Sequence, residues 1–311
     1  MRSRCSRAIL GPPRIARAAS LSSPGHDVFL KIETDLPTGS FKVRGAIYSL
    51  SRKLAKNALL YTPIVEVVCA STGNHGAAVA YAARLLGVAA TIFLPVDPNP
   101  VKAARIRDLG ARIVESGVDL SATIDAAQDY ATRTAAFFLH DASDPDVPAG
   151  AATIGLEIVD QLPAVGVIYV PMGDTALIRG VASAAKQHRP SIRIVGVVAE
   201  KAPGYLLSWK SGEVVETATC DTIADGLAIR RPLALNVAAI RDLVDDVVAV
   251  SEEEMMAAID LLYAREQVIA EPAGAAATAA LLKRPPTAGT SVVLATGGNV
   301  APGLRPKRAA G

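Results

Sequence analysis

The sequence has little of several features that mark whole classes of protein. Its 311 residues include 3 cysteines, and Cys5, Cys69 and Cys220 form no C-x-x-C pair, which argues against a disulfide framework and a structural zinc site. The net charge of +2 predicts no broad basic surface for nucleic acid. Glycine, proline or charge interrupts every apolar run before the roughly 20 residues needed to cross a bilayer. We therefore expect neither nucleic acid nor a membrane as partner. We also expect the protein to reside in a reducing compartment, the cytoplasm.

The first 26 residues are basic and contain no acidic residue. Arginines, serines and a lack of acids are typical of a mitochondrial transit peptide, here residues 1–25. The alternative is a basic segment on the surface of the folded protein. We expect the second, because composition alone is a weak signal for targeting.

From residue 27 onward, short β-branched runs alternate with longer helical patterns. This alternation, with nearly continuous apolar strands, predicts an α/β fold of two open parallel-sheet lobes with helices on both faces. A cluster of Asp and Pro at 141–148 suggests a boundary, so we expect residues 1–60 and 145–311 to form a large domain and 61–144 a small one. Strands are expected at 28–32, 65–70, 89–94, 112–115, 167–171, 192–198, 246–250 and 291–295, and helices at 76–86, 101–109, 121–134, 178–188, 252–266 and 274–282.

Four glycine-containing turns follow predicted strands, where α/β folds place their ligand sites. The first, 37–46, puts Lys42 at the start of a helix, a position that the helix dipole disfavours for a cation. The exposed N–H groups of such turns suit a carboxylate or phosphate. None of the turns is a nucleotide-binding loop of the Walker A or G-x-G-x-x-G kind. The other three turns are 71–76, 171–177 and 295–299.

Taken together, these motifs resemble those of the tryptophan-synthase-β-like (fold type II) enzymes that use pyridoxal 5′-phosphate (PLP), in the branch of threonine/serine dehydratases and serine racemases. The resemblance extends from about residue 29 to 300. It rests on S-F-K-V-R-G-A at 40–46, S-T-G-N-H-G at 71–76, T-I-A-D-G at 222–226, R-D-L-V-D-D at 241–246, E-P-A-G at 271–274 and G-G-N at 297–299.

The resemblance implies a set of site residues, with PLP in the cleft between the two lobes. Lys42 would hold PLP covalently and later take the α-proton of the substrate, as a lysine beside the reacting carbon can. Thr296 would hydrogen-bond the pyridine nitrogen. The other implied PLP-binding residues are Phe41, Asn74, Gly173, Asp174, Thr175, Ala176 and Leu177, and the substrate carboxylate would be bound by Ser71, Thr72, Gly73, Asn74 and His75.

Several positions depart from the family pattern, and three of them bear directly on the site. The phosphate loop carries Asp174 where a glycine is usual, and we expect its side chain to face solvent while the backbone N–H groups bind the phosphate. Thr72 stands where the racemase has a serine acid/base, and its branched Cβ restricts the hydroxyl. Leu206 replaces an expected carboxylate ligand of the family's cation site, near Glu200 and Gly204, so we expect no metal.

The sequence therefore predicts an ammonia-lyase that eliminates the β-hydroxyl of L-threonine, L-serine or a similar amino acid. Two alternatives remain open at this point. One is an amino-acid racemase, and the other is a degenerate relative that binds PLP without turnover. A small amino acid is the expected substrate, and a homodimer is the expected assembly.

Overall fold

The computed structural model describes residues 10–71, 73–98, 100–118 and 120–304. Thr72, one of the predicted substrate-binding residues, and residues 1–9 of the basic segment lie outside this part of the chain. Contacts divide the chain into two units. Among the described residues, one contains residues 42–150, and the other combines residues 11–41 with residues 151–304.

The unit of residues 42–150 is built on a parallel sheet with the strand order β5-β4-β3-β6. Helix α5 packs on one face of this sheet through Ala127 and Ala131, which contact Val68 and Phe93. The strands are β3 (Glu66–Ala70), β4 (Ala89–Leu94), β5 (Arg112–Glu115) and β6 (Phe137–Phe138), and the helices are α2 (Lys42–Leu59), α3 (Asn74–Leu86), α4 (Pro100–Asp108) and α5 (Leu120–Thr134).

The second unit is built on a sheet with the order β1-β2-β10-β7-β8-β9, in which only β1 and β2 pair antiparallel. The strands are β1 (Ile15–Arg17), β2 (His26–Ile32), β7 (Val167–Pro171), β8 (Arg193–Ala199), β9 (Asp246–Val250) and β10 (Gly289–Ala295). The helices are α6 (Val147–Gln161), which begins in the other unit, α7 (Ala176–His188), α8 (Gly204–Ser211), α9 (Ala234–Leu243), α10 (Glu252–Glu266) and α11 (Pro272–Lys283). The short 3-10 helices are η1 (Glu33–Asp35), η2 (Asp225–Leu227) and η3 (Pro302–Leu304).

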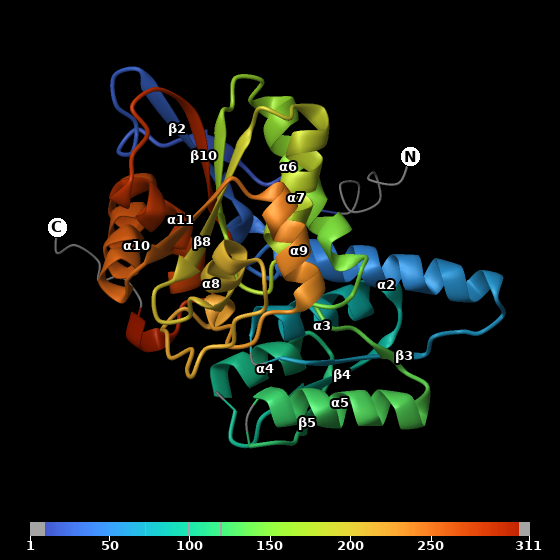
Figure 1. Ribbon diagram of the computed structural model, residues 1–311. Coiled ribbons are helices and arrows are strands. Elements are labelled where there is room, and N and C mark those ends of the chain that lie inside the picture. The colour runs from blue at the N-terminus through green and yellow to red at the C-terminus, as the bar shows by residue number, and fades with distance from the viewer. Residues whose placement is uncertain (1–9, 72, 99, 119, 305–311) are drawn as a thin grey trace. The chain divides into compact units, whose positions relative to one another are not determined.

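Helices cover both faces of this second sheet (Figure 1). Successive side chains of a strand point to opposite faces, so Ile168 and Val170 pack with α6, α7 and α9, while Tyr169 packs with α10 and α11. The predicted fold class, α/β with parallel sheets, is confirmed. No helix among the described residues combines the length and apolar character that a bilayer crossing requires.

Part of the basic N-terminal segment belongs to the second sheet. Residues 15–17 form edge strand β1, in register with Phe29–Lys31 of β2. Arg17 pairs with Asp27 at 2.7 Å, and Arg14 pairs with Asp35 at the same distance. Removal of residues 1–25 as a transit peptide would therefore strip this sheet of its edge strand.

The division between the units differs from the predicted domain boundaries at two places. Helix α2 was expected with the large domain, but it packs against α3 and belongs with residues 42–150. The second division falls between residues 150 and 151 rather than 144 and 145, because the cluster of Asp and Pro is the start of α6. There the Asp144 carboxylate accepts hydrogen bonds from the N–H groups of Asp146 and Val147, at 2.8 and 3.1 Å.

Candidate active site

Lys42 is the first residue of α2, and its ammonium group is paired with a carboxylate. The distance from Lys42 Nζ to Asp141 Oδ2 is 2.7 Å. The two side chains are 14% and 22% exposed, so the amine is partly reachable by small molecules. Asp141 also places negative charge near the start of α2, which offsets the unfavourable position of a lysine there. Sequence reasoning missed Asp141, because it lies 99 residues from Lys42 in the chain.

His75 lies beside the same carboxylate but is fixed by another contact. Its Nε2 is 3.1 Å from the carbonyl oxygen of Leu139, and because a carbonyl can only accept, Nε2 carries the proton. Its Nδ1 is 3.8 Å from Asp141 Oδ2, too far for a hydrogen bond. Burial lowers the pKa of His75 from 6.5, against the opposing effect of Asp141. His75 is therefore neutral near pH 7, and Lys42 is the cation that Asp141 holds.

The turn predicted to bind the substrate carboxylate opens helix α3. Gly73 is the residue before the helix, Asn74 is its first residue, and the Gly73 N–H donates to Ser71 Oγ at 3.2 Å. The first turn of a helix presents N–H groups without helical acceptors, which suits an anion. Cys69, in the preceding strand, is fully buried, and burial, with a smaller effect of Asp141, raises the pKa of its thiol.

The predicted phosphate loop follows β7 and leads into α7. A side chain at Gly173 would collide with the carbonyl of Gly226, so the T-I-A-D-G motif packs against this loop and only glycine fits there. Thr175 adopts a φ of 73°, in the left-handed region that a β-branched residue rarely occupies. Ala176 and Leu177 are buried in the first turn of α7.

The Asp174 side chain is half-buried and turned to the helix that follows it, whereas we expected it to face solvent. Its Oδ1 accepts the N–H of Ala176 at 2.8 Å, so a carboxylate occupies part of the helix N-terminus that the phosphate is expected to use. The side-chain amide of Asn236 donates to the Asp174 carbonyl at 3.2 Å and holds the loop. The charge of Asp174 acts on Arg179, whose pKa is lowered mainly by burial. A short acidic side chain can accept the backbone N–H two residues further on, and this contact draws Asp174 to the start of the helix.

Backbone contacts join Phe41 to the last predicted turn. The Phe41 N–H donates to the carbonyl of Thr296 at 3.0 Å, and Lys42 is the next residue of the chain. A side chain at Gly274 would collide with Gly297, which explains why E-P-A-G and G-G-N occur together. Ser40 Oγ is buried with no hydrogen-bond partner within the described part of the chain, as expected of a polar atom beside a ligand site.

Lys31, the other lysine near the motif, is held elsewhere. Its side chain is fully buried, with Nζ 2.8 Å from Glu157, 3.2 Å from Glu33 and 2.9 Å from the carbonyl of Pro13. An amine enclosed by two carboxylates and a carbonyl cannot reach a cofactor. Lys42 is therefore the better candidate.

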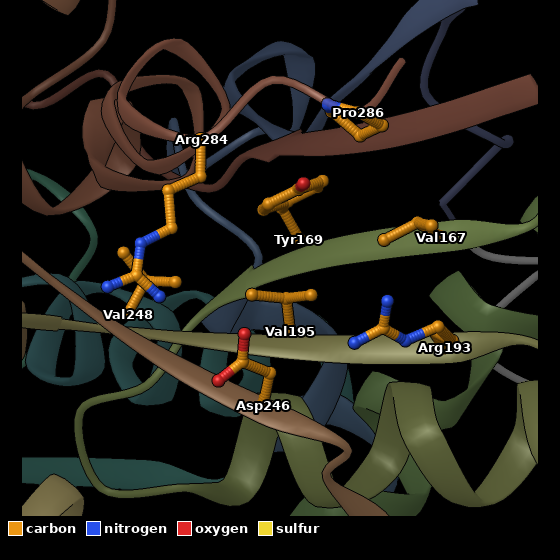
Figure 2. Close-up of a pocket in the computed structure, with 8 residues that line it drawn as sticks. All are labelled: Val167, Tyr169, Arg193, Val195, Asp246, Val248, Arg284 and Pro286. Carbon is orange, nitrogen blue, oxygen red and sulfur yellow. The ribbon is translucent and has the colours of Figure 1, made fainter. Parts of the chain in front are cut away.

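One pocket, of about 220 Å³, is lined by residues of β7, β8, β9 and the segment after α11 (Figure 2). Arg193 and Asp246 are the first residues of β8 and β9, so the pocket lies at the amino ends of the strands. The loop of Gly173, by contrast, follows the carboxyl end of β7. None of the predicted site residues lines this pocket.

The residues present fit PLP in chemical kind: an accessible lysine, helix N-termini for anions, and an orphaned hydroxyl next to Phe41. Lys42, Ser71, Gly73, Asn74 and His75 lie in one unit, and Phe41, the loop 173–177 and Thr296 in the other. Leu206, at the expected cation position, packs into the apolar core of the second unit. No group of three metal-binding side chains occurs among the residues described, and the absence of a metal remains a prediction.

Comparison with known proteins agrees with this chemistry. A family model described as pyridoxal-phosphate dependent enzyme matches residues 8–297. An L-threonine ammonia-lyase of Geobacter sulfurreducens is 39% identical over 282 residues, covering 89% of this chain and 68% of that protein. The catabolic L-threonine dehydratase TdcB of Escherichia coli K12 is 38% identical over 256 residues, covering 82% of this chain and 76% of that protein.

Solved structures show the same relationship. Maize serine racemase superimposes with a TM-score of 0.89 at 30% identity, covering 97% of this chain and 94% of that one. The processed form of threonine deaminase isoform 2 from Solanum lycopersicum superimposes with a TM-score of 0.88 at 29% identity, covering 96% of this chain and 82% of that one. The chain belongs to the pyridoxal-phosphate-dependent enzymes of fold type II, in the group that contains threonine ammonia-lyases and serine racemases.

Proposed function

We propose that the protein is an ammonia-lyase that converts L-threonine or L-serine to a 2-oxo acid and ammonia. The observation that carries the proposal is the position of Lys42: it is accessible at the start of α2, while Lys31 is enclosed by carboxylates. When bound, PLP supplies an electron sink that stabilises negative charge at the substrate α-carbon.

The residues of the chain have separate tasks in this proposal. The turn from Ser71 to His75 binds the substrate carboxylate and so fixes which bond at the α-carbon faces Lys42. Lys42 takes the α-proton. The β C–O bond then breaks and the hydroxide leaves as water, so that the substrate loses one water in all: the α-hydrogen, taken as a proton by Lys42, and the β-hydroxide. The enamine that remains reacts with water to give the 2-oxo acid and ammonia.

Thr296 favours elimination over racemisation. Racemisation needs a carbanion that survives until a proton arrives on the opposite face. A carboxylate at the pyridine nitrogen would keep that nitrogen protonated and prolong the life of the carbanion, whereas a threonine hydroxyl holds the proton less firmly. A difference of about 1.4 kcal/mol between the two barriers is enough for a tenfold bias in products.

The test measures both products from the same mixture. With L-serine and L-threonine, we expect 2-oxo acid and ammonia to form at least about tenfold faster than D-isomer, as measured by an oxo-acid assay and chiral chromatography. Lys42→Ala should lose turnover and the visible absorbance of bound PLP. Faster accumulation of D-isomer would establish the racemase instead, and PLP binding without either product would establish the degenerate relative.

The proposal extends to the cellular location of the protein and its oligomeric state. We propose that the protein acts in the cytoplasm, because β1 ties residues 15–17 into the second sheet and leaves them unsuited to removal with a transit peptide. The expected assembly is a homodimer. Light scattering after size exclusion measures the mass in solution.

A further inference from the structure

The pair formed by Lys42 and Asp141 has a consequence beyond holding α2 in place. We infer that Asp141 is a positioning residue that keeps Lys42 as an ammonium group in the cofactor-free chain. Asp141 thereby opposes capture of PLP and fixes the position of the lysine before the cofactor binds. The inference rests on the proposed role of Lys42.

The geometry favours a strong and specific contact. The Nζ–Oδ2 distance of 2.7 Å is that of a charge-assisted hydrogen bond. With exposures of 14% and 22%, the two groups are only partly screened by water. Exposed ion pairs contribute little, but a partly enclosed pair of this length retains more of its attraction.

Three other titratable groups, His75, His140 and Cys69, lie near the Asp141 carboxylate. From α3, His75 points its protonated Nε2 at Leu139 and keeps Nδ1 at 3.8 Å from Asp141. In the loop after β6, His140 Nδ1 accepts the N–H of Ala142 at 3.2 Å and lies 4.0 Å from Asp141. From β3, Cys69 is a buried thiol whose pKa is raised well above its usual value by burial, with a smaller contribution from Asp141.

The proton balance follows from this arrangement. Only a neutral amine can attack the aldehyde carbon of PLP, and formation of the C=N link releases one water. The ammonium group held by Asp141 must therefore first give one proton to solvent. Capture of PLP is expected to become faster as the pH rises. At a given pH, it is expected to be faster when a neutral residue replaces Asp141.

The first experiment uses the cofactor-free full chain and needs no turnover. The amines are labelled with a limiting amount of acetic anhydride, and the Lys42 peptide is compared by mass spectrometry with the other lysine peptides of the same sample. Asp141→Asn is expected to increase labelling of Lys42 at pH 7.5 about tenfold, which corresponds to about 1.4 kcal/mol less stabilisation of the ammonium group. PLP capture, followed by its absorbance, should accelerate in parallel.

Asp146→Asn is the matched control, because Asp146 lies in the same segment and faces Arg52 at 3.4 Å. It should leave Lys42 labelling unchanged. If Asp141→Asn does not fold, the test is made on the wild-type chain by measuring labelling as a function of pH. Labelling of Lys42 should then reach half its maximum at a higher pH than labelling of the exposed Lys210. Equal labelling of Lys42 with and without the Asp141 carboxylate, or equal midpoints for the two lysines, overturns the inference.

The proposed function can fail independently of this inference. If Lys42→Ala still binds PLP covalently, the assignment of Lys42 is wrong, and the role of Asp141 toward PLP is wrong with it. If Lys42→Ala loses PLP but Asp141→Asn changes neither labelling nor capture, the proposed function stands and the inference alone is refuted.

Discussion

Asp174 offers a direct test of how this chain binds the phosphate of PLP. Its carboxylate accepts the Ala176 N–H at 2.8 Å, at the N-terminus of α7 where the phosphate is expected. A carboxylate and a phosphate are both anions, so each disfavours the other at one helix end. Replacement by asparagine keeps an oxygen that can accept the same N–H and removes only the charge.

The size of the effect follows from Coulomb's law. Two unit charges about 6 Å apart repel each other by ~0.7 kcal/mol in bulk water and by ~2.8 kcal/mol at the effective dielectric constant of a protein surface. Asp174 is half-buried, which places it between these limits, and the nearby Arg179 offsets part of the repulsion. We therefore expect Asp174→Asn to bind PLP about tenfold more tightly, or ~1.4 kcal/mol.

The assay compares two cofactors on the cofactor-free chain. PLP and pyridoxal differ by the phosphate, so Asp174→Asn should tighten binding of PLP and leave binding of pyridoxal unchanged. Asp260→Asn, which removes an exposed carboxylate from α10, is the control for a general change in charge. Unchanged or weaker binding of PLP, or an equal gain for pyridoxal, would refute the reasoning.

Two further predictions concern stability. Lys31→Ala is expected to lower the free energy of unfolding by about 3–5 kcal/mol, because it takes the cation from two fully buried carboxylates. Urea denaturation measures the free energy of unfolding. The control, Lys210→Ala, should change it by less than about 0.5 kcal/mol. A Lys31→Ala variant as stable as the wild type would contradict a stabilising role for the contacts of Lys31 with Glu33 and Glu157. The lowered pKa of His75 means that the unfolded chain binds more protons than the folded one as the pH falls below 6.5, so stability should decrease on acidification. His75→Gln, which keeps a donor for Leu139, should lose less stability between pH 7 and pH 5, and equal losses in thermal melts would contradict this.

The strands of the parallel sheets were predictable, because their apolar runs are short, β-branched and bounded by turns. Strands β4, β5, β7 and β9 begin and end at the predicted residues. Strand β1 was missed because it has three residues and depends on pairing with Phe29–Lys31, which its own composition does not reveal. Strand β6, with two residues, gives no periodic signal at all.

The site was predictable where a motif carries it and unpredictable where a single side chain decides it. The position of Lys42 at a helix start followed from the strand and turn before it. Its partner Asp141 did not, because an ion pair across 99 residues leaves no local pattern. The orientation of the Asp174 side chain depends on its rotamer and on the N–H of Ala176, which no sequence pattern specifies.

The arrangement of β2 in the second sheet has a consequence for the order in which a newly made chain can fold. β2 lies between β1 and β10, and His26 pairs with Gly289. A chain emerging from the ribosome therefore presents a two-stranded hairpin, with Val28 and Leu30 uncovered, until almost all of the remaining sequence has been made. Residues 42–150 are contiguous and can close their own sheet in the meantime. We expect the hairpin to be the segment most in need of a chaperone during synthesis, and a circular permutant that places β10 directly before β1 to reduce that need.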